Sequence, residues 1–275
     1  MLAGCGGGDP VAESPVSEDP GAIHVHGLGI NPGDGALFIA THTGMFRAAP
    51  GETTALRVSD SYQDTMGFTV IGPDHFLGSG HPDGRDDLPP FLGLIESRDG
   101  GETWQSVSLL GNADFHVLEA RGEQIYGFGS DWETRETQFL VSSDAGETWE
   151  KRPVPKPLIS LAVHPKDGNR LVASGERAIY SSRDRGESWQ KRADTAGLVV
   201  WRSERELISI DGDGLVHASM DGTDWRRIGE VGGQPAAFEA KRGGLYVALH
   251  DGTIKLSGDG GASWKVRSRP SPDPA

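Results

Sequence analysis

The sequence has very little cysteine, few basic side chains and no long apolar run, and each shortage excludes a class of protein. Its 275 residues contain one cysteine, Cys5, so no disulfide can form within them. Lys and Arg number 26 against 40 Asp and Glu, and the formal net charge of −14 argues against nucleic-acid binding and against attraction to anionic lipid. No apolar run approaches the ~20 residues of a membrane-spanning helix. What is abundant is glycine, at 40 residues, as expected of short strands joined by turns.

An eight-residue pattern, Ser-x-Asp-x-Gly-x-x-Trp, recurs along the chain. Its copies end at Trp104, Trp149, Trp189 and Trp264, and a copy one residue shorter ends at Trp225. Their Asp residues lie 37 to 45 residues apart, a period close to the ~40–45 residues that are typical of propeller blades. Ser and Asp side chains can close a tight turn through the backbone, Gly supplies a positive φ, and Trp buries a large ring. The pattern therefore indicates a structural turn.

These boxes resemble the Asp-box, or BNR, repeats of the sialidase superfamily, which also occur in sortilin-type receptors and photosystem II assembly factors. The resemblance covers most of the chain and implies an all-β, six-bladed β-propeller with Asp-box turns between strands C and D. Five blades carry a box, and the segment before the first box is long enough for one more blade. Because members of the superfamily include hydrolases, receptors and scaffolds, the boxes imply a fold and not a reaction.

The two ends of the chain differ from its middle in composition. Residues 1–21 are rich in Gly, Pro, Ser and acidic side chains, and we expect a disordered tether there, a propeller at 22–268 and a second disordered tail at 269–275. The tetrapeptide Leu-Ala-Gly-Cys that ends at Cys5 resembles the lipobox of bacterial lipoproteins. That resemblance implies lipidation of Cys5 and a lipid-anchored protein at the outer face of the cytoplasmic membrane or at the cell surface.

Alternating strand direction sorts the turns of a propeller onto two faces. The boxes occupy one face with the A–B turns, and the opposite face carries the starts of the inner A strands and the B–C turns. Six of the nine histidines map to this opposite face, together with six carboxylates and a methionine. We call it the histidine face; these residues are His24, His26, His42, His81, His116, His250, Asp64, Asp114, Asp131, Glu176, Asp211, Asp213 and Met66.

Histidine and carboxylate side chains gathered on one face predict a transition-metal site. Imidazole suits zinc or copper, and carboxylates can complete such a site. His24 and His26 are two positions apart, which places both rings on one side of a strand. The candidate ligands are His24, His26, His42, His81 and His116, with Met66 and His250 beside them, and Met66 would favour copper. The alternative is that these are separate polar groups around a water-filled channel.

Two B–C segments on the histidine face are expected to be long loops, at residues 81–90 and 130–138. Long loops on a rigid scaffold commonly carry binding residues. Trp132 and Arg135 lie in the second loop, and Glu176 lies in the B–C turn of blade 4. We regard these three residues as candidates for the rim of a ligand site, where an aromatic ring can stack on a sugar or gate a pocket.

Sialidase activity is not expected from this sequence. Sialidases bind the substrate carboxylate with three arginines, whereas no A-strand start here contains Arg and the Arg-Ile-Pro tripeptide is missing. A glycosidase using two carboxylates, with Asp64 and Asp114 as weak catalytic candidates, remains an alternative. The chain also resembles a group of bacterial lipoproteins labelled glycosylhydrolases, through the motifs at 24–29, 64–68 and 80–83. That resemblance implies the fold more than the reaction.

Three functions are therefore open. The first is an extracytoplasmic, lipid-anchored propeller that binds copper or zinc, or a metal-dependent ligand, on the histidine face. The second is a sialidase-like glycoside hydrolase acting on a glycan or another small molecule, and the third is a protein-binding scaffold for assembly. A dry, featureless axial face with an apolar patch on its rim would favour the scaffold. A nucleic-acid partner is not expected.

Overall fold

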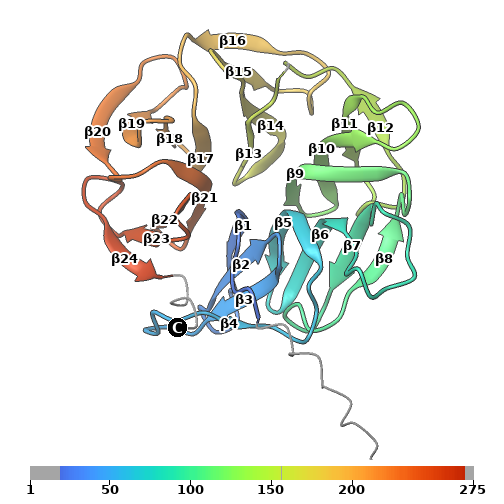
Figure 1. Ribbon diagram of the computed structural model, residues 1–275. Coiled ribbons are helices and arrows are strands. Elements are labelled where there is room, and N and C mark those ends of the chain that lie inside the picture. Colours follow the sequence, from blue (N-terminus) through green and yellow to red (C-terminus); the bar gives the residue numbers. More distant parts are fainter. Residues whose placement is uncertain (1–18, 156, 270–275) are drawn as a thin grey trace, which may run out of the picture.

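The computed structural model describes residues 19–155 and 157–269, which form a ring of six blades (Figure 1). Every blade is a four-stranded antiparallel sheet, and the described residues form no helix and hence no helix able to span a membrane. The prediction of an all-β, six-bladed propeller is confirmed. Cys5, most of the expected tether and most of the expected tail lie outside the described residues.

The strands follow one another in chain order, four to a blade. Blade 1 has β1 (Val25–Ile30), β2 (Leu37–Thr41), β3 (Gly44–Ala48) and β4 (Leu56–Arg57). Blade 2 has β5 (Asp64–Gly72), β6 (His75–His81), β7 (Leu94–Ser97) and β8 (Gln105–Ser108). Blade 3 has β9 (Ala113–Arg121), β10 (Gln124–Asp131), β11 (Thr137–Ser142) and β12 (Glu150–Arg152). Blade 4 has β13 (Ser160–His164), β14 (Asp167–Ser174), β15 (Ile179–Ser182) and β16 (Gln190–Ala193). Blade 5 has β17 (Leu198–Ser203), β18 (Glu206–Ile210), β19 (Leu215–Ser219) and β20 (Arg226–Glu230). Blade 6 has β21 (Pro235–Lys241), β22 (Gly244–Leu249), β23 (Ile254–Ser257) and β24 (Lys265–Ser268).

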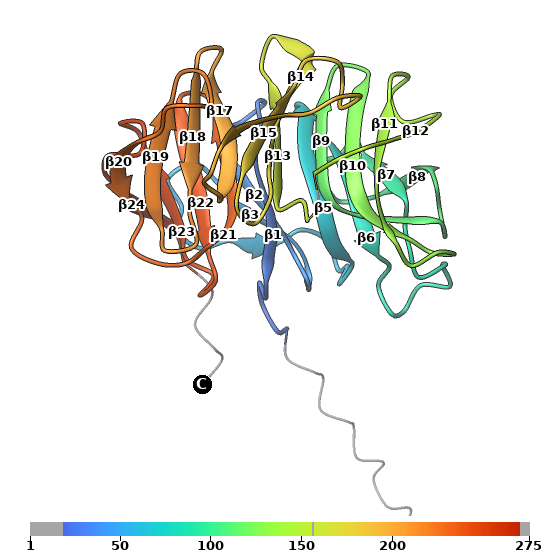
Figure 2. The ribbon, with the colours of Figure 1, turned by 90° about the horizontal axis from the view of Figure 1, so that it is seen from above.

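The first strand of each blade lies next to the axis, and the strands cross the thickness of the disc (Figures 1 and 2). The ring closes where blade 6 meets blade 1. There β21 contacts β1, Ser268 Oγ donates a hydrogen bond of 2.9 Å to the Thr53 carbonyl, and Arg269 bridges to Thr54 in parallel. The two ends of the described chain therefore meet in the same part of the ring.

The core is a series of apolar layers between neighbouring blades. Between blades 1 and 2, the Phe76 ring meets Phe38 and Phe68 edge-on, with ring centroids 4.7 and 5.5 Å apart. Trp104, from the first box, packs against this layer, and Trp149 packs on Phe115 in the next one. The box tryptophans thus contribute to the contact between blades, as the sequence predicts.

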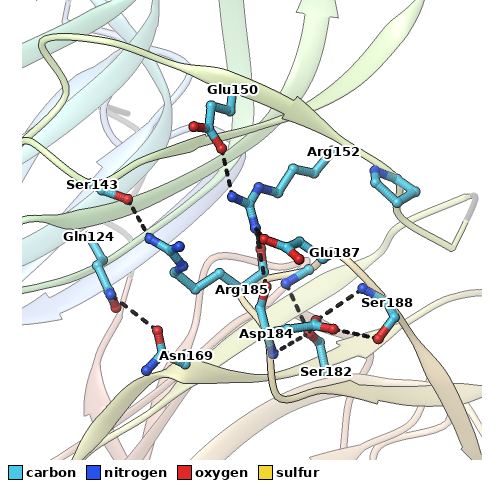
Figure 3. Close-up of polar contacts among 12 residues, drawn as sticks. Gln124, Ser143, Glu150, Arg152, Asn169, Ser182, Asp184, Arg185, Glu187 and Ser188 are labelled. Atoms are coloured by element: carbon cyan, nitrogen blue, oxygen red, sulfur yellow. Dashed lines mark hydrogen bonds and ion pairs between the residues drawn. The ribbon is translucent and has the colours of Figure 1, made fainter.

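The boxes close their turns through the side chains that recur in the sequence. In blade 4, Ser182 Oγ accepts a hydrogen bond of 2.8 Å from Gly186 N and donates one of 2.7 Å to Asp184 (Figure 3). Asp184 also accepts from the backbone N and the hydroxyl of Ser188. Arg185 extends the turn to the neighbouring blade, since it donates to Ser143 Oγ at 2.8 Å (Figure 3). The same bond, from the glycine N–H to the serine hydroxyl, closes the boxes of blades 2, 3 and 6.

Hydrogen bonds between turns define the two faces. The box of blade 2 is tied to an A–B turn, because Gly100 N donates to the Asp74 carbonyl at 2.9 Å. On the opposite face, Trp132 N in a B–C turn donates to Asn112 O in the connection between blades 2 and 3 at 2.9 Å. This is the histidine face, and it carries the starts of the inner strands.

One expected loop is shorter than the sequence indicated. The segment 130–138 was expected to be a long excursion, but β10 continues to Asp131 and β11 begins at Thr137. Ser130 pairs with Thr137, so only a five-residue turn, 132–136, leaves the sheet. The polar side chains of this segment lie at the solvent-exposed end of a strand pair. Amino-acid composition alone does not distinguish such an end from a loop.

Substitution of the buried box serine tests its structural role. We expect Ser182→Ala to lower the free energy of unfolding by about 1–3 kcal/mol, because it leaves the buried Gly186 N–H without an acceptor. The measurement is urea denaturation, with Ser181→Ala on the same strand as the matched control, expected within ~0.5 kcal/mol of the wild type. Equal stabilities of the two variants would contradict the role of the box.

Candidate functional site

A central cavity of about 480 Å³ opens among the inner strands. Histidines from blades 1, 3 and 6 line it together with Met66, and Glu119 and Glu239 lie further along the strands. The cavity therefore joins the histidine face to an acidic section near the axis. The lining histidines are His24, His26, His116 and His250.

Three predicted residues converge beside the cavity, and we call them the first cluster: His26, His42 and Asp64. His26 comes from β1, His42 from the following B–C turn, and Asp64 from the start of β5. Their ligand atoms all lie within 4.8 Å of one another. His42 Nδ1 is 2.8 Å from Asp64 Oδ2, and His26 Nε2 is 3.3 Å from Asp64 Oδ1. The His24 ring approaches from the side, with its centroid 6.3 Å from that of His42.

The electrostatics of the first cluster favour an ionised carboxylate. Burial alone would raise the pKa of Asp64, but the neighbouring His26 and His42 outweigh it and hold this pKa below its ordinary value. His26 Nε2 and Asp64 Oδ1 are both buried and lack a hydrogen-bond partner among the described residues. A nitrogen and an oxygen that share a tetrahedral zinc ion are about 3.3–3.5 Å apart. The observed 3.3 Å therefore suits a bound transition-metal ion.

A second group of the same composition lies one blade further on, and we call it the second cluster: His81, Asp114 and His116. His116 Nε2 is 2.8 Å and His81 Nε2 is 3.6 Å from Asp114 Oδ2. The hydrogen bond to Asp114 raises the pKa of His116 above its ordinary value. His81 Nδ1 is 2.8 Å from the carbonyl oxygen of Pro90.

The conformation of His24 differs from the one assumed in the sequence argument. β1 begins at Val25, so His24 precedes the strand, and its φ is +50°. The pairing of β1 with β2 also shifts register between Val25 and Gly27. Alternation along a regular strand therefore does not explain the placement of His24 and His26, although both line the cavity.

The remaining candidates lie around the rim. The Trp132 ring packs edge-on against Phe91, with centroids 5.1 Å apart, and the Arg135 guanidinium lies 3.8 Å from the Trp132 ring centroid. Glu176 is exposed on blade 4 and lines a separate hollow. Two histidines that the sequence did not assign to the site have other partners. His75 pairs with Glu96 at 2.6 Å, and His164 packs on Trp201.

Sequence reasoning missed two acidic residues near the axis, Glu119 on β9 and Glu239 on β21. Burial raises the pKa of Glu119 to about 8, and the charge of Glu239 adds to this shift. Burial also raises the pKa of Glu239 to about 7, against the opposing effect of Lys241. The available signal was a Glu directly between two apolar residues of an inner strand, since a side chain points to the channel when its immediate neighbours point to the core.

Comparison with known proteins supports the propeller resemblance. A family model described as sortilin, neurotensin receptor 3, matches residues 93–229, just under half of the chain. The human VPS10 domain-containing receptor SorCS2 is 28% identical over 122 residues, 42% of this chain and 10% of the receptor. The chloroplastic photosystem II stability/assembly factor HCF136 of Arabidopsis thaliana is 28% identical over 106 residues, 35% of this chain and 25% of the factor. The matched segments thus span a quarter or less of these relatives.

Among solved structures, a gluconolactonase from Xanthomonas campestris shares the fold with a TM-score of 0.66. The two are 14% identical over 83% of this chain and 84% of the other. Such a likeness concerns the fold alone. The relatives are sortilin-type and assembly-factor proteins, so the comparisons support a propeller family and do not single out the sialidase type.

The acidic pair near the axis predicts a pH-dependent stability. The folded chain retains the Glu119 proton where the unfolded chain releases it, so stability falls as the pH rises from about 4.5 to about 8. We expect Glu119→Gln to raise the melting temperature at pH 8.5 by about 2–4 °C, the effect of ~1 kcal/mol in a domain of this size, and to change it little at pH 4.5. Thermal melts at both pH values test this, with the exposed Glu123→Gln as control. An equal shift at both pH values would exclude the proposed titration.

Proposed function

We propose that this propeller binds a partner protein through its histidine face and acts as an assembly scaffold. The carrying observation is an apolar patch on the rim of that face, which we call the rim patch: Leu88, Leu110 and Trp132. These side chains are 47%, 37% and 37% exposed. Exposed large apolar and aromatic side chains, grouped rather than scattered, mark protein-interaction sites. Only this half of the expectation for a scaffold, the apolar patch, is met, because the axial face holds a cavity lined by histidines and is not featureless.

The rim patch is a preformed surface, because backbone hydrogen bonds join three segments of the chain beneath it. Gly111 N donates to the Phe91 carbonyl at 2.7 Å, and Trp132 N donates to the Asn112 carbonyl at 2.9 Å. The buried Phe91 ring supports the exposed Trp132 ring. Rigid aromatic side chains lose little entropy on binding, which favours them as anchors for a partner.

The distribution of apolar side chains distinguishes the two faces. Of the eight large apolar side chains that are exposed in the described part of the chain, five belong to the histidine face. They are Ile23, Leu88, Leu110, Trp132 and Ile159. The others are on strand β4, at an A–B turn and in a box. The similarity to one protein named as a receptor and to another named as a stability/assembly factor supports the same reading.

The proposed location follows from the resemblance at Cys5. Lipidation of Cys5 would place the propeller on the outer face of the cytoplasmic membrane or at the cell surface. The negative net charge would keep the domain away from anionic lipid, so that the anchor alone holds it there. A partner would then be an extracytoplasmic protein or a segment of a membrane protein.

Site-specific photo-crosslinking in the native cells tests partner binding. With a benzoylphenylalanine at Leu110 we expect a discrete protein adduct, and none with the same group at Met220 on the box face. Adding Trp132→Ser should weaken binding roughly 30-fold, the loss that ~2 kcal/mol at an aromatic hot spot produces. The exposed Leu56→Ser is the matched control and should leave the adduct unchanged. The same adducts from both faces would contradict the proposal.

A second candidate function, transition-metal binding, is favoured by the first cluster. Two imidazoles and a buried carboxylate are a donor set that suits zinc or copper(II). Met66 lines the same cavity and would add a soft donor for copper. The carboxylates that the glycosidase alternative would use, Asp64 and Asp114, both contact imidazoles, and no observation favours that reaction.

Metal retention tests this second function. After loading with zinc or copper(II) and dialysis, His26→Ala should retain one ion fewer per chain than the wild type, measured by mass spectrometry. His75→Ala, which breaks the pair with Glu96 away from the site, is the matched control and should retain the wild-type content. Equal metal contents of wild type and His26→Ala would exclude the first cluster as a site.

A further inference from the structure

We infer that the second cluster, His81, Asp114 and His116, is a second transition-metal site beside the first. This inference deepens the metal-binding function and rests on it. It extends the site from one blade interface to two consecutive interfaces, between blades 1 and 2 and between blades 2 and 3. The ligand class is a divalent ion that accepts imidazole nitrogen and carboxylate oxygen, zinc or copper(II).

The first observation that supports this site is the burial of the Asp114 carboxylate. Its side chain is only 4% exposed, and its Oδ1 atom has no hydrogen-bond partner within the described residues. A buried carboxylate oxygen without a partner is costly. The two imidazoles beside it are partly exposed, at 38% for His81 and 47% for His116, so an ion can reach the cluster from solvent.

The second observation is the orientation of the His81 ring. A carbonyl oxygen only accepts hydrogen bonds, so the contact of 2.8 Å with Pro90 O requires the hydrogen on His81 Nδ1. The Nε2 atom is then the ring atom that faces Asp114 Oδ2, at 3.6 Å, a separation too long for a direct hydrogen bond between them. A histidine whose outer nitrogen donates to a carbonyl while its inner nitrogen faces a carboxylate has the tautomer and orientation of a metal ligand.

Spacing agrees with this assignment for two of the three donors. Ligand atoms on a tetrahedral zinc ion lie about 3.3–3.5 Å apart, close to the 3.6 Å between His81 Nε2 and Asp114 Oδ2. His116 Nε2 is 2.8 Å from the same oxygen, but it lies more than 4.8 Å from His81 Nε2, unlike the ligand atoms of the first cluster. The His116 ring must therefore rotate away from its hydrogen bond with Asp114 to become the third donor.

The blade repeat explains why two clusters occur side by side. In both, a histidine of a B–C turn meets an aspartate that starts the next inner strand: His42 with Asp64, and His81 with Asp114. Asp64 and His81 are also direct partners in the pairing of β5 with β6, so the clusters share one strand pair. Met66 occupies in β5 the position that His116 occupies in β9, two residues after the aspartate.

Metal stoichiometry with variants of each cluster tests the inference. The protein is loaded with zinc or copper(II), dialysed and analysed by mass spectrometry, and titration calorimetry gives the affinities. We expect two ions per chain in the wild type, and one ion in His81→Ala and in Asp114→Asn, which preserves the volume of the buried side chain. His26→Ala should also retain one ion, and His75→Ala should retain two. Circular dichroism confirms that each variant is folded.

The outcomes separate the two sites. One ion in the wild type, lost in His26→Ala but not in His81→Ala or Asp114→Asn, overturns the second site and leaves the first. One ion lost only in His81→Ala and Asp114→Asn supports the second site and overturns the first. Two ions whose number does not change in His81→Ala or Asp114→Asn overturn the inference, and no retained ion overturns both sites.

Discussion

The packing of each blade against its neighbours is the constraint on which the rest of the structure depends. A four-stranded sheet has two faces to bury, and here each face packs on the next blade through clusters such as the one around Phe38 and Phe76. Only a closed ring leaves no blade with an open face. Closure brings six inner strands to one axis and therefore brings together side chains that are up to ~200 residues apart in the sequence, such as those of β1 and β21.

Convergence of the inner strands also concentrates acidic groups where solvation is poor. The structure meets this cost in two ways. Near the histidine face, imidazoles contact Asp64 and Asp114 and keep the first of these carboxylates ionised. Near the axis, no imidazole of the described residues pairs with Glu119 or Glu239, and the charge of Lys241 offsets only part of the cost of burial, so their pKa values rise instead. The same geometry thus yields a charged region suited to a cation and a region that holds protons.

The sequence predicted what depends on periodicity and strand direction, and missed what depends on local rotamers. Regular boxes define the blades, and alternation of strands places His42, His81 and His116 on one face without knowledge of any contact. It could not predict the positive φ of His24, which reflects a chain entering a bulged strand. It could not predict that both imidazoles of the second cluster face Asp114 Oδ2 while Oδ1 is left without a hydrogen-bond partner in the described part of the chain, because side-chain rotamers decide this. The rim patch joins Leu110, in the connection between blades 2 and 3, to Trp132 of blade 3, so it exists only after these neighbouring blades have packed together.

The two proposed functions are physically connected through one aromatic contact. The His81 ring lies 5.6 Å from the Phe91 ring, and Phe91 supports Trp132 in the rim patch. An ion held by His81 would restrict this ring and, through Phe91, the surface that meets a partner. Because coupling free energies are reciprocal, a partner that prefers one orientation of Trp132 would change the affinity for the ion by the same factor. A scaffold of this kind needs no large motion to respond to metal, since the responsive residues are already in contact on one rigid face.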